Sequence, residues 1–101
     1  MKFEMKRKID NLGRITLPLD LWEYYGIKSG EPAILLSVRK GIQIAPSEYF
    51  IMEQVPDDSI ITVDESGRCE IPTVFKNQYH FEPEDTLCIL PGETCILIYK
   101  D

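Results

Sequence analysis

The 101-residue sequence is poor in the residues that build metal, redox and acid–base sites. Its single histidine, His80, has no nucleophile or ligand set beside it, and the three cysteines, Cys69, Cys88 and Cys95, form no Cys-x-x-Cys pair. The sequence also lacks a Gly-rich phosphate loop and a nucleophile elbow. We therefore predict no catalytic site, no metal site and no cofactor, and we interpret the cysteines as small buried apolar residues.

Long apolar runs are absent as well. No run approaches the roughly 20 residues of a membrane span, and the first ten residues, MKFEMKRKID, have no apolar core of the signal-peptide type. These absences predict a cytoplasmic protein with no membrane partner. Hydrophobic residues still make up 44% of the chain, which is enough for one small packed interior.

Positive charge is scarce, and it is unevenly distributed. The chain has 11 Lys and Arg against 17 Asp and Glu, but residues 1–47 hold eight of these cations and only five of the acids. Residues 48–101 hold the other three cations and twelve acids. A basic hairpin on an acidic protein is typical of a β-ribbon that contacts DNA, and a solvated turn that aids solubility is the alternative. Four cations gather in the hairpin segment KRKIDNLGR, namely Lys6, Arg7, Lys8 and Arg14.

The two halves of the sequence repeat one another. A shift of 54 residues aligns them without a gap and gives eight identities over 42 positions. The identities include the Asp-x-x-Gly-Arg turn at Asp10 and again at Asp64, and the prolines Pro18 and Pro72. We interpret this as a tandem duplication. The predicted division is a first repeat at 1–47, a linker at 48–59 and an acidic second repeat at 60–101.

Each repeat reads as two strands, a short helix and two strands. A Gly-containing turn follows Asp10 or Asp64, and Pro18 or Pro72 then opens the helix, where a missing N–H costs nothing. One repeat is too small to bury a core of its own, so the two are expected to share one. The predicted fold class is mainly β with short helices, built from two β-β-α-β-β units.

The run RKIDNLGRITLP, followed by a short helix and GEPAILLSV…GIQI, closely resembles the AbrB/MazE/SpoVT family of swapped-hairpin DNA-binding proteins. The resemblance covers residues 6–46, and more weakly residues 60–99 through VDESGRCEIP. It implies an interleaved β-barrel in which the two units exchange hairpins, here as a pseudo-dimer within one chain. It also implies a transcriptional regulator that binds double-stranded DNA, and association of two chains as a homodimer remains open.

The resemblance assigns the DNA contacts to Arg7, Lys8 and Arg14, with Lys6 beside them in the same basic strand. Arg14 has a structural alternative, because an Arg after the turn glycine can pair with Asp10 across the hairpin. The second repeat has lost most of these cations and keeps only Arg68 of the four.

A second hypothesis is a protein-interaction module, antitoxin-like or scaffolding, that has lost DNA binding. Its acidic second repeat would face a basic protein partner. Trp22 and Tyr24 have no counterpart of the same type in the second repeat, and we interpret them as a possible partner surface. An enzyme is not expected under either hypothesis.

Overall fold

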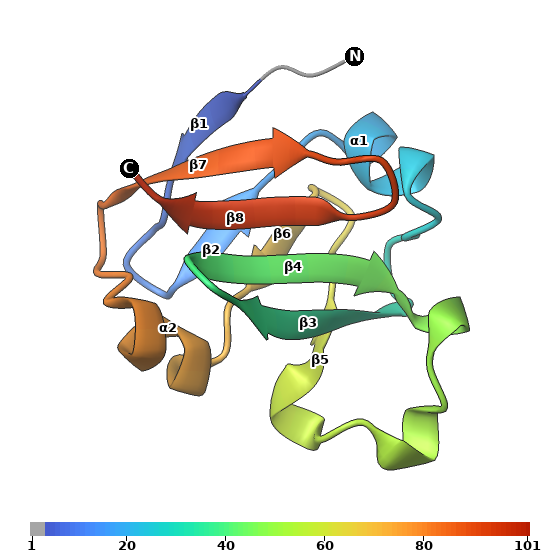
Figure 1. The fold of residues 1–101 in the computed structure, drawn as a ribbon. Helices are drawn as coiled ribbons and strands as arrows, with labels where there is room; N and C mark the ends of the chain where they lie inside the picture. Colours follow the sequence, from blue (N-terminus) through green and yellow to red (C-terminus); the bar gives the residue numbers. More distant parts are fainter. Residues whose placement is uncertain (1–3) are drawn as a thin grey trace.

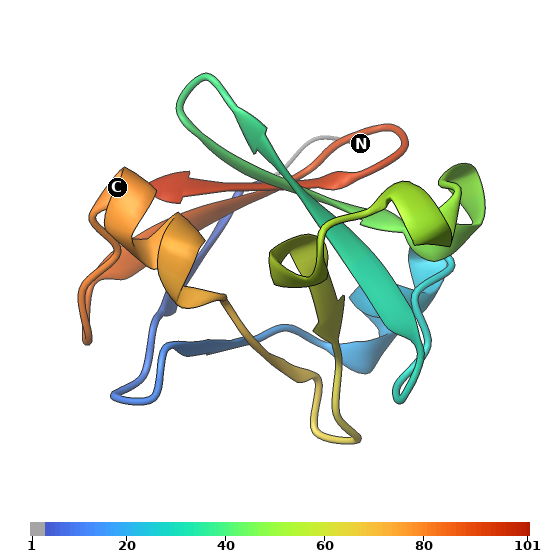
Figure 2. The ribbon, with the colours of Figure 1, turned by 90° about the horizontal axis from the view of Figure 1, so that it is seen from below.

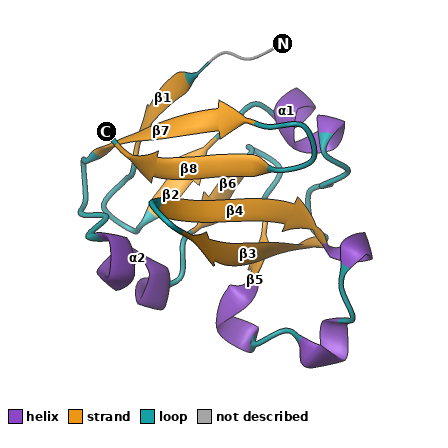
Figure 3. Cartoon of the chain, viewed as in Figure 1, coloured by secondary structure: helices purple, strands orange, loops and turns teal. Residues whose placement is uncertain are grey.

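The computed structural model describes residues 4–101 (Figure 1). Strands dominate the chain, and the remaining regular elements are two short helices and three 3-10 turns in the connector (Figure 3). The elements follow the predicted order of two strands, a helix and two strands, twice over. In chain order they are β1 (Met5–Lys8), β2 (Arg14–Thr16), α1 (Leu19–Tyr24), β3 (Pro32–Val38), β4 (Gly41–Pro46), η1 (Ser47–Tyr49), η2 (Met52–Gln54), η3 (Asp57–Ser59), β5 (Ile60–Thr62), β6 (Arg68–Glu70), α2 (Thr73–Tyr79), β7 (Thr86–Pro91) and β8 (Ile96–Lys100).

The strands form two antiparallel sheets rather than the closed barrel expected from the sequence. Six strands are hydrogen-bonded in the order β1-β7-β8-β4-β3-β5, and β2 and β6 form a separate two-stranded ribbon. The barrel prediction is therefore wrong. The reason lies at the turns: Asp10 N–H still donates to the Arg14 carbonyl at 2.9 Å, but beyond this bond β1 pairs with β7 while β2 pairs with β6.

Strands from the two halves of the chain are interleaved within the larger sheet, because the first strand of each half pairs with a strand of the other half. The first strand of the first half, β1, pairs with β7 of the second half, with Met5 opposite Ile89. The corresponding strand of the second half, β5, pairs with β3 of the first half, with Thr62 opposite Pro32. Exchanging the two halves turns the strand order into its own reverse. The shift of 54 residues that aligns the sequence therefore also relates the strand pairings.

Two tyrosine hydroxyls cross between the halves in the same way. Tyr25 donates to the carbonyl of Gly92 at 2.6 Å, and Tyr79 donates to the carbonyl of Val38 at 2.8 Å. Donors and acceptors are each 54 positions apart in the sequence. Each helix is thus tied to the hairpin turn of the opposite half.

The turns after the two helices keep the same backbone conformation although the residues differ. Gly26 and Gly30 have φ values of 78° and 83°. The residues 54 positions later, His80 and Glu84, have φ values of 57° and 70°. A side chain in this left-handed region costs about 1–2 kcal/mol. The second half retains the turn geometry at a cost that the first half avoids with glycine.

The hydrophobic core lies between the six-stranded sheet and the β2–β6 ribbon, and α1 and α2 close two opposite sides of it (Figure 2). Both halves of the chain contribute large apolar side chains to this core, and no polar side chain of residues 4–101 is buried. None of the helices in this range is long and apolar enough to cross a membrane. The largest fully buried side chains are Trp22, Ile9, Ile15, Leu17, Ile27, Ile34, Leu35, Ile42, Ile44, Ile71, Leu87 and Ile89.

The cysteines follow the sequence prediction in two of three cases. Cys69 and Cys88 are buried, and all three thiols are free. Desolvation raises the pKa of the Cys69 thiol to about 12, which makes it an inert apolar residue. Cys95 is only half-buried, because it is the last residue of the turn between β7 and β8.

Candidate nucleic-acid interface

The predicted basic strand forms an edge of the six-stranded sheet. Lys6, Arg7 and Lys8 all belong to β1, whose only neighbour in that sheet is β7. Successive side chains of a strand point to opposite faces. Lys6 and Lys8 are accordingly exposed, whereas Arg7 is half-buried on the other face, where its Nη1 donates to the carbonyl of Lys6 at 2.9 Å. The structure therefore brings two of these three cations to one face and separates the third.

Lys6 already has an anionic partner. Its Nζ lies 3.2 Å from the carboxylate of Asp101. The hydrogen bond from Lys6 holds the pKa of Asp101 below its ordinary value, and the same bond raises the pKa of Lys6. Both side chains are about half exposed, at 54% and 47%. Ion pairs with this exposure are weak, so Lys6 is free to exchange Asp101 for another anion.

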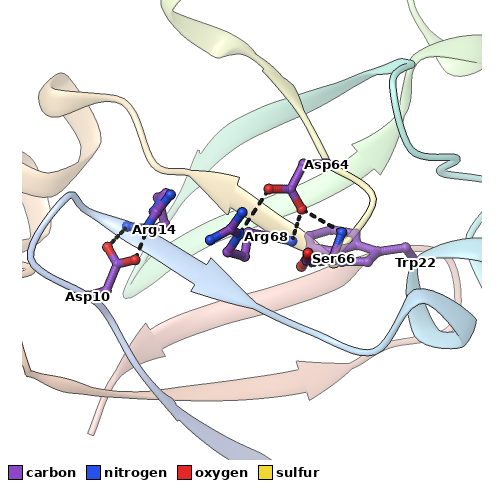
Figure 4. A network of polar contacts seen from close by, with 7 residues as sticks. Asp10, Arg14, Trp22, Asp64, Ser66 and Arg68 are labelled. Carbon is purple, nitrogen blue, oxygen red and sulfur yellow. Dashed lines mark hydrogen bonds and ion pairs between the residues drawn. The ribbon is translucent and has the colours of Figure 1, made fainter.

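The hairpin turn after β1 is closed by a single carboxylate. One oxygen of Asp10 accepts the N–H groups of Leu12 and Arg14 at 2.9 and 2.8 Å, and the other accepts Arg14 Nε at 2.8 Å. Figure 4 shows the two contacts with Arg14. The hydrogen bond from the Arg14 backbone N–H is the main reason why the pKa of Asp10 is lowered. The structural role of Arg14, as the partner of Asp10, is thus present in the molecule.

The second turn repeats this arrangement atom for atom. The Asp64 carboxylate accepts the N–H groups of Ser66 and Arg68 at 2.8 and 3.0 Å and the Arg68 Nε at 2.9 Å (Figure 4). Its pKa is also lowered, mainly by the hydrogen bond from the Arg68 backbone N–H. Arg68 forms this ion pair with Asp64 although the second half lacks counterparts of Lys6, Arg7 and Lys8. Pairing with the turn aspartate is therefore the role that Arg14 and Arg68 share.

Arg14 and Arg68 nevertheless lie on one surface. β2 pairs with β6 so that Arg14 is opposite Glu70 and Thr16 is opposite Arg68, while Ile15 and its partner on β6 are buried on the other face. The outer face of this ribbon therefore presents both arginines, and their Nε ion pairs leave the ends of the guanidinium groups for other contacts. The sequence prediction omitted Arg68 from the site, although the retained Asp-x-x-Gly-Arg run was the signal for it.

Trp22 does not belong to any surface, and this prediction is wrong. Its side chain is fully buried, and its Nε1 donates to the carbonyl of Gly67 at 3.0 Å. Trp22 lies on α1 three residues before the buried Tyr25, which directly follows the helix, so the helix period carries both to the core. Tyr24 is 77% exposed and packs edge-on against Tyr25. It remains a candidate for a partner surface by itself.

We expect acid to weaken the fold through the two turn aspartates. A carboxylate whose pKa is lower in the folded state contributes stability above its ordinary value near pH 4, and that stability is lost as the pH falls through the folded-state pKa. Asp10 and Asp64 both meet this condition, and Asp85 and Asp101 do so as well. Replacing Asp10 and Asp64 with asparagine should therefore flatten the decline between about pH 4 and pH 2 without abolishing it.

Urea unfolding of the parent and the double asparagine variant across this pH range measures the effect. The two stabilities should converge at low pH and separate at neutral pH. A constant difference at every pH would contradict the assignment of the lowered pKa values to these two turns.

Residues 4–101 contain no group of three or more His, Cys, Asp or Glu side chains placed to hold a metal ion. The sequence matches no protein-family model and no curated protein. Among solved structures, the solution structure of PHS018 from Pyrococcus horikoshii is similar to this chain, with 19% sequence identity and a TM-score of 0.48. The alignment covers 97% of this chain and 92% of that chain.

Proposed function

We propose that this protein is a DNA-binding transcriptional regulator of the AbrB/MazE/SpoVT type. The observation that carries the proposal is the exposed basic strand β1 at the edge of the sheet, in an acidic protein with a net charge of −6. Lys6 and Lys8 project from one face of this edge, and the end of Arg14 projects from the adjoining ribbon. Each cation that neutralises a phosphate releases a counterion, so a few such residues can supply most of the affinity.

The proposal includes the architecture. The pairing of β1 with β7 and of β5 with β3 is what two β-β-α-β-β units that exchange strands would show. We assign this arrangement to the swapped-hairpin type, as a pseudo-dimer within one chain. In this assignment, Arg14 and Arg68 occupy equivalent positions, and the first half supplies the additional cations of β1. Sequence-specific readout would come from arginine, which can hold a guanine edge through two hydrogen bonds.

Removing Lys6 and Lys8, the two cations on the exposed face of β1, should weaken binding to duplex DNA about tenfold or more and lower the salt dependence of log K by about two. The measurement is retention of a pool of random-sequence duplexes at low salt, followed by titration of the enriched sequence with the Lys6→Ala, Lys8→Ala double variant. Arg14 stays intact in this experiment, because its removal would also break the Asp10 ion pair.

A matched control removes the same charge elsewhere. Arg39 and Lys40 lie in the β3–β4 turn, on the opposite side of the molecule from the β1–β2 turn (Figure 2). The Arg39→Ala, Lys40→Ala double variant should bind nearly as well as the parent. If no duplex is retained, or if both double variants lose affinity equally, the basic strand is not the DNA contact.

A second candidate function is binding of a basic protein through the connector between the halves. The connector exposes acidic side chains beside two large apolar ones, Tyr49 at 66% and Ile51 at 62%. Such a mixture of apolar anchors within a charged rim is typical of protein interfaces. The DNA-retention experiment separates the two functions. If the protein binds only a basic protein partner, the parent protein should retain no duplex DNA. The exposed acids are Glu48, Glu53, Asp57 and Asp58.

A further inference from the structure

A cavity of about 200 Å³ lies between the first hairpin turn and α2. Its base is apolar and is formed by Ile9 and Phe81, both of them core residues. Apart from Pro83, its walls are polar, and they come from the two halves of the chain. They are formed by Asn11, Gly13, Thr73, Lys76, Asn77 and Glu82.

Lys76 is the cation of this cavity, and its charge is uncompensated. The side chain is half-buried, and no carboxylate of residues 4–101 lies within 4.0 Å of its Nζ. Its ammonium group rests against the backbone of the turn, where a Cβ on Gly13 would come within 2.2 Å of Nζ. Glycine at this position therefore leaves the room that the ammonium group occupies.

The equivalent position in the other half is filled by a different kind of side chain. Trp22 is 54 residues before Lys76, and it is fully buried against Gly67, the counterpart of Gly13. In that half the space between turn and helix holds an indole ring whose N–H has a partner. In this half a shorter cation replaces the ring, and space for a ligand remains beside it. Packing alone would favour the apolar side chain at both positions.

We propose that this cavity binds a phosphate group, carried either by a small molecule or by the DNA backbone. The ammonium group of Lys76 supplies the charge, and the side-chain amides of Asn11 and Asn77 and the hydroxyl of Thr73 supply hydrogen-bond donors. The volume suits a tetrahedral anion with a few bound waters and is small for a drug-sized ligand. Glu82 is exposed and also lines the cavity, so its carboxylate weakens the binding of an anion there.

Titration of the 15N-labelled protein with sodium phosphate at constant ionic strength tests this proposal. Saturable shifts are expected for the backbone amides of Asn11, Gly13 and Asn77. The Lys76→Gln variant should bind phosphate about tenfold more weakly or worse, and Lys76→Arg should retain binding. Glu82→Gln removes the repulsion and should tighten binding several-fold.

The control is Lys40→Gln, which removes the same charge from a distant turn and should leave the affinity unchanged. Shifts that do not saturate, or equal affinity in the parent and Lys76→Gln, would overturn the proposal. Because the parent protein is titrated first, a variant that fails to fold does not affect this test.

Binding of duplex DNA distinguishes the two sources of phosphate. If Lys76→Gln also weakens DNA binding and lowers its salt dependence by about one, the ligand is the DNA backbone. If Lys76→Gln binds DNA normally but has lost phosphate, the ligand is a free phosphate compound. In the backbone case the site rests on the proposed function. Loss of phosphate shifts and loss of duplex retention are measured separately, so failure of one proposal is not mistaken for failure of the other.

Discussion

Replacing Trp22 with alanine is expected to lower the free energy of unfolding by about 3–5 kcal/mol. Trp22 is the largest fully buried side chain of the described residues, and its ring occupies the space between α1 and the second hairpin turn. Alanine would leave a cavity there that the short helix cannot close. A loss of this size is a large part of the 5–15 kcal/mol that holds a domain together.

The Trp22→Phe variant separates packing from hydrogen bonding. The Gly67 carbonyl also accepts the N–H of Leu17 at 2.9 Å, so it keeps one partner when the indole N–H at 3.0 Å is removed. Phenylalanine should therefore cost only about 1 kcal/mol for the lost bond, plus a small term for lost volume.

Urea unfolding followed by circular dichroism measures both variants. Glu23→Ala is the control, because it changes the adjacent, exposed position of the same helix and should remain within about 0.5 kcal/mol of the parent. A cost below about 1 kcal/mol for Trp22→Ala would mean that Trp22 does not fill the core as described.

The second large effect is expected for Gly67→Ala, which should cost about 4 kcal/mol or more. Gly67 has a φ of 84°, and a Cβ there would lie 2.1 Å from the carbonyl oxygen of Leu17. Backbone atoms of Leu17, the residue that follows β2, would have to move, and the two hydrogen bonds to the Gly67 carbonyl would move with them. Both the left-handed conformation and the steric clash therefore act against alanine.

Gly30→Ala isolates the conformational part of this cost. Gly30 has a nearly identical φ of 83°, but no heavy atom lies within 4 Å of its added Cβ. Alanine there should cost only the 1–2 kcal/mol or so of a left-handed side chain. The difference between the two variants in urea unfolding reports the close approach of turn and strand. Equal costs would show that the backbone at Gly67 has more room than described.

The order of elements was predictable because the signals for it are local. The Asp-x-x-Gly turns, the prolines before the helices and the alternating apolar residues each act within a few positions, and the structure has the elements in this order. Strand partners were a different matter. The pairing of β1 with β7 depends on which strand is left free after the others pair, and no short pattern in β1 specifies it.

The candidate site was predictable only in part, for similar reasons. The cations of β1 were visible in the sequence, but the contact of Lys6 with Asp101 joins residues 95 positions apart. The surface position predicted for Trp22 rested on its having no counterpart of the same type in the second repeat, whereas the helix period puts it on the buried side with Tyr25. The cavity beside Lys76 arises from the approach of a turn and a helix from different halves, which only the tertiary structure shows.

The pairing of strands from different halves has a consequence for synthesis on the ribosome. Met5 is opposite Ile89, so β1 is synthesised long before β7, the strand with which it pairs. Closing a loop of this length is slow, and contacts between residues so far apart are typical of slowly folding domains. Until β7 is made, the exposed edge of β1 is protected from other nascent chains only by its own lysines, which discourage edge-to-edge pairing. The positive charge of β1 thus lowers the tendency of the incomplete chain to aggregate, independently of any ligand that β1 binds in the folded protein.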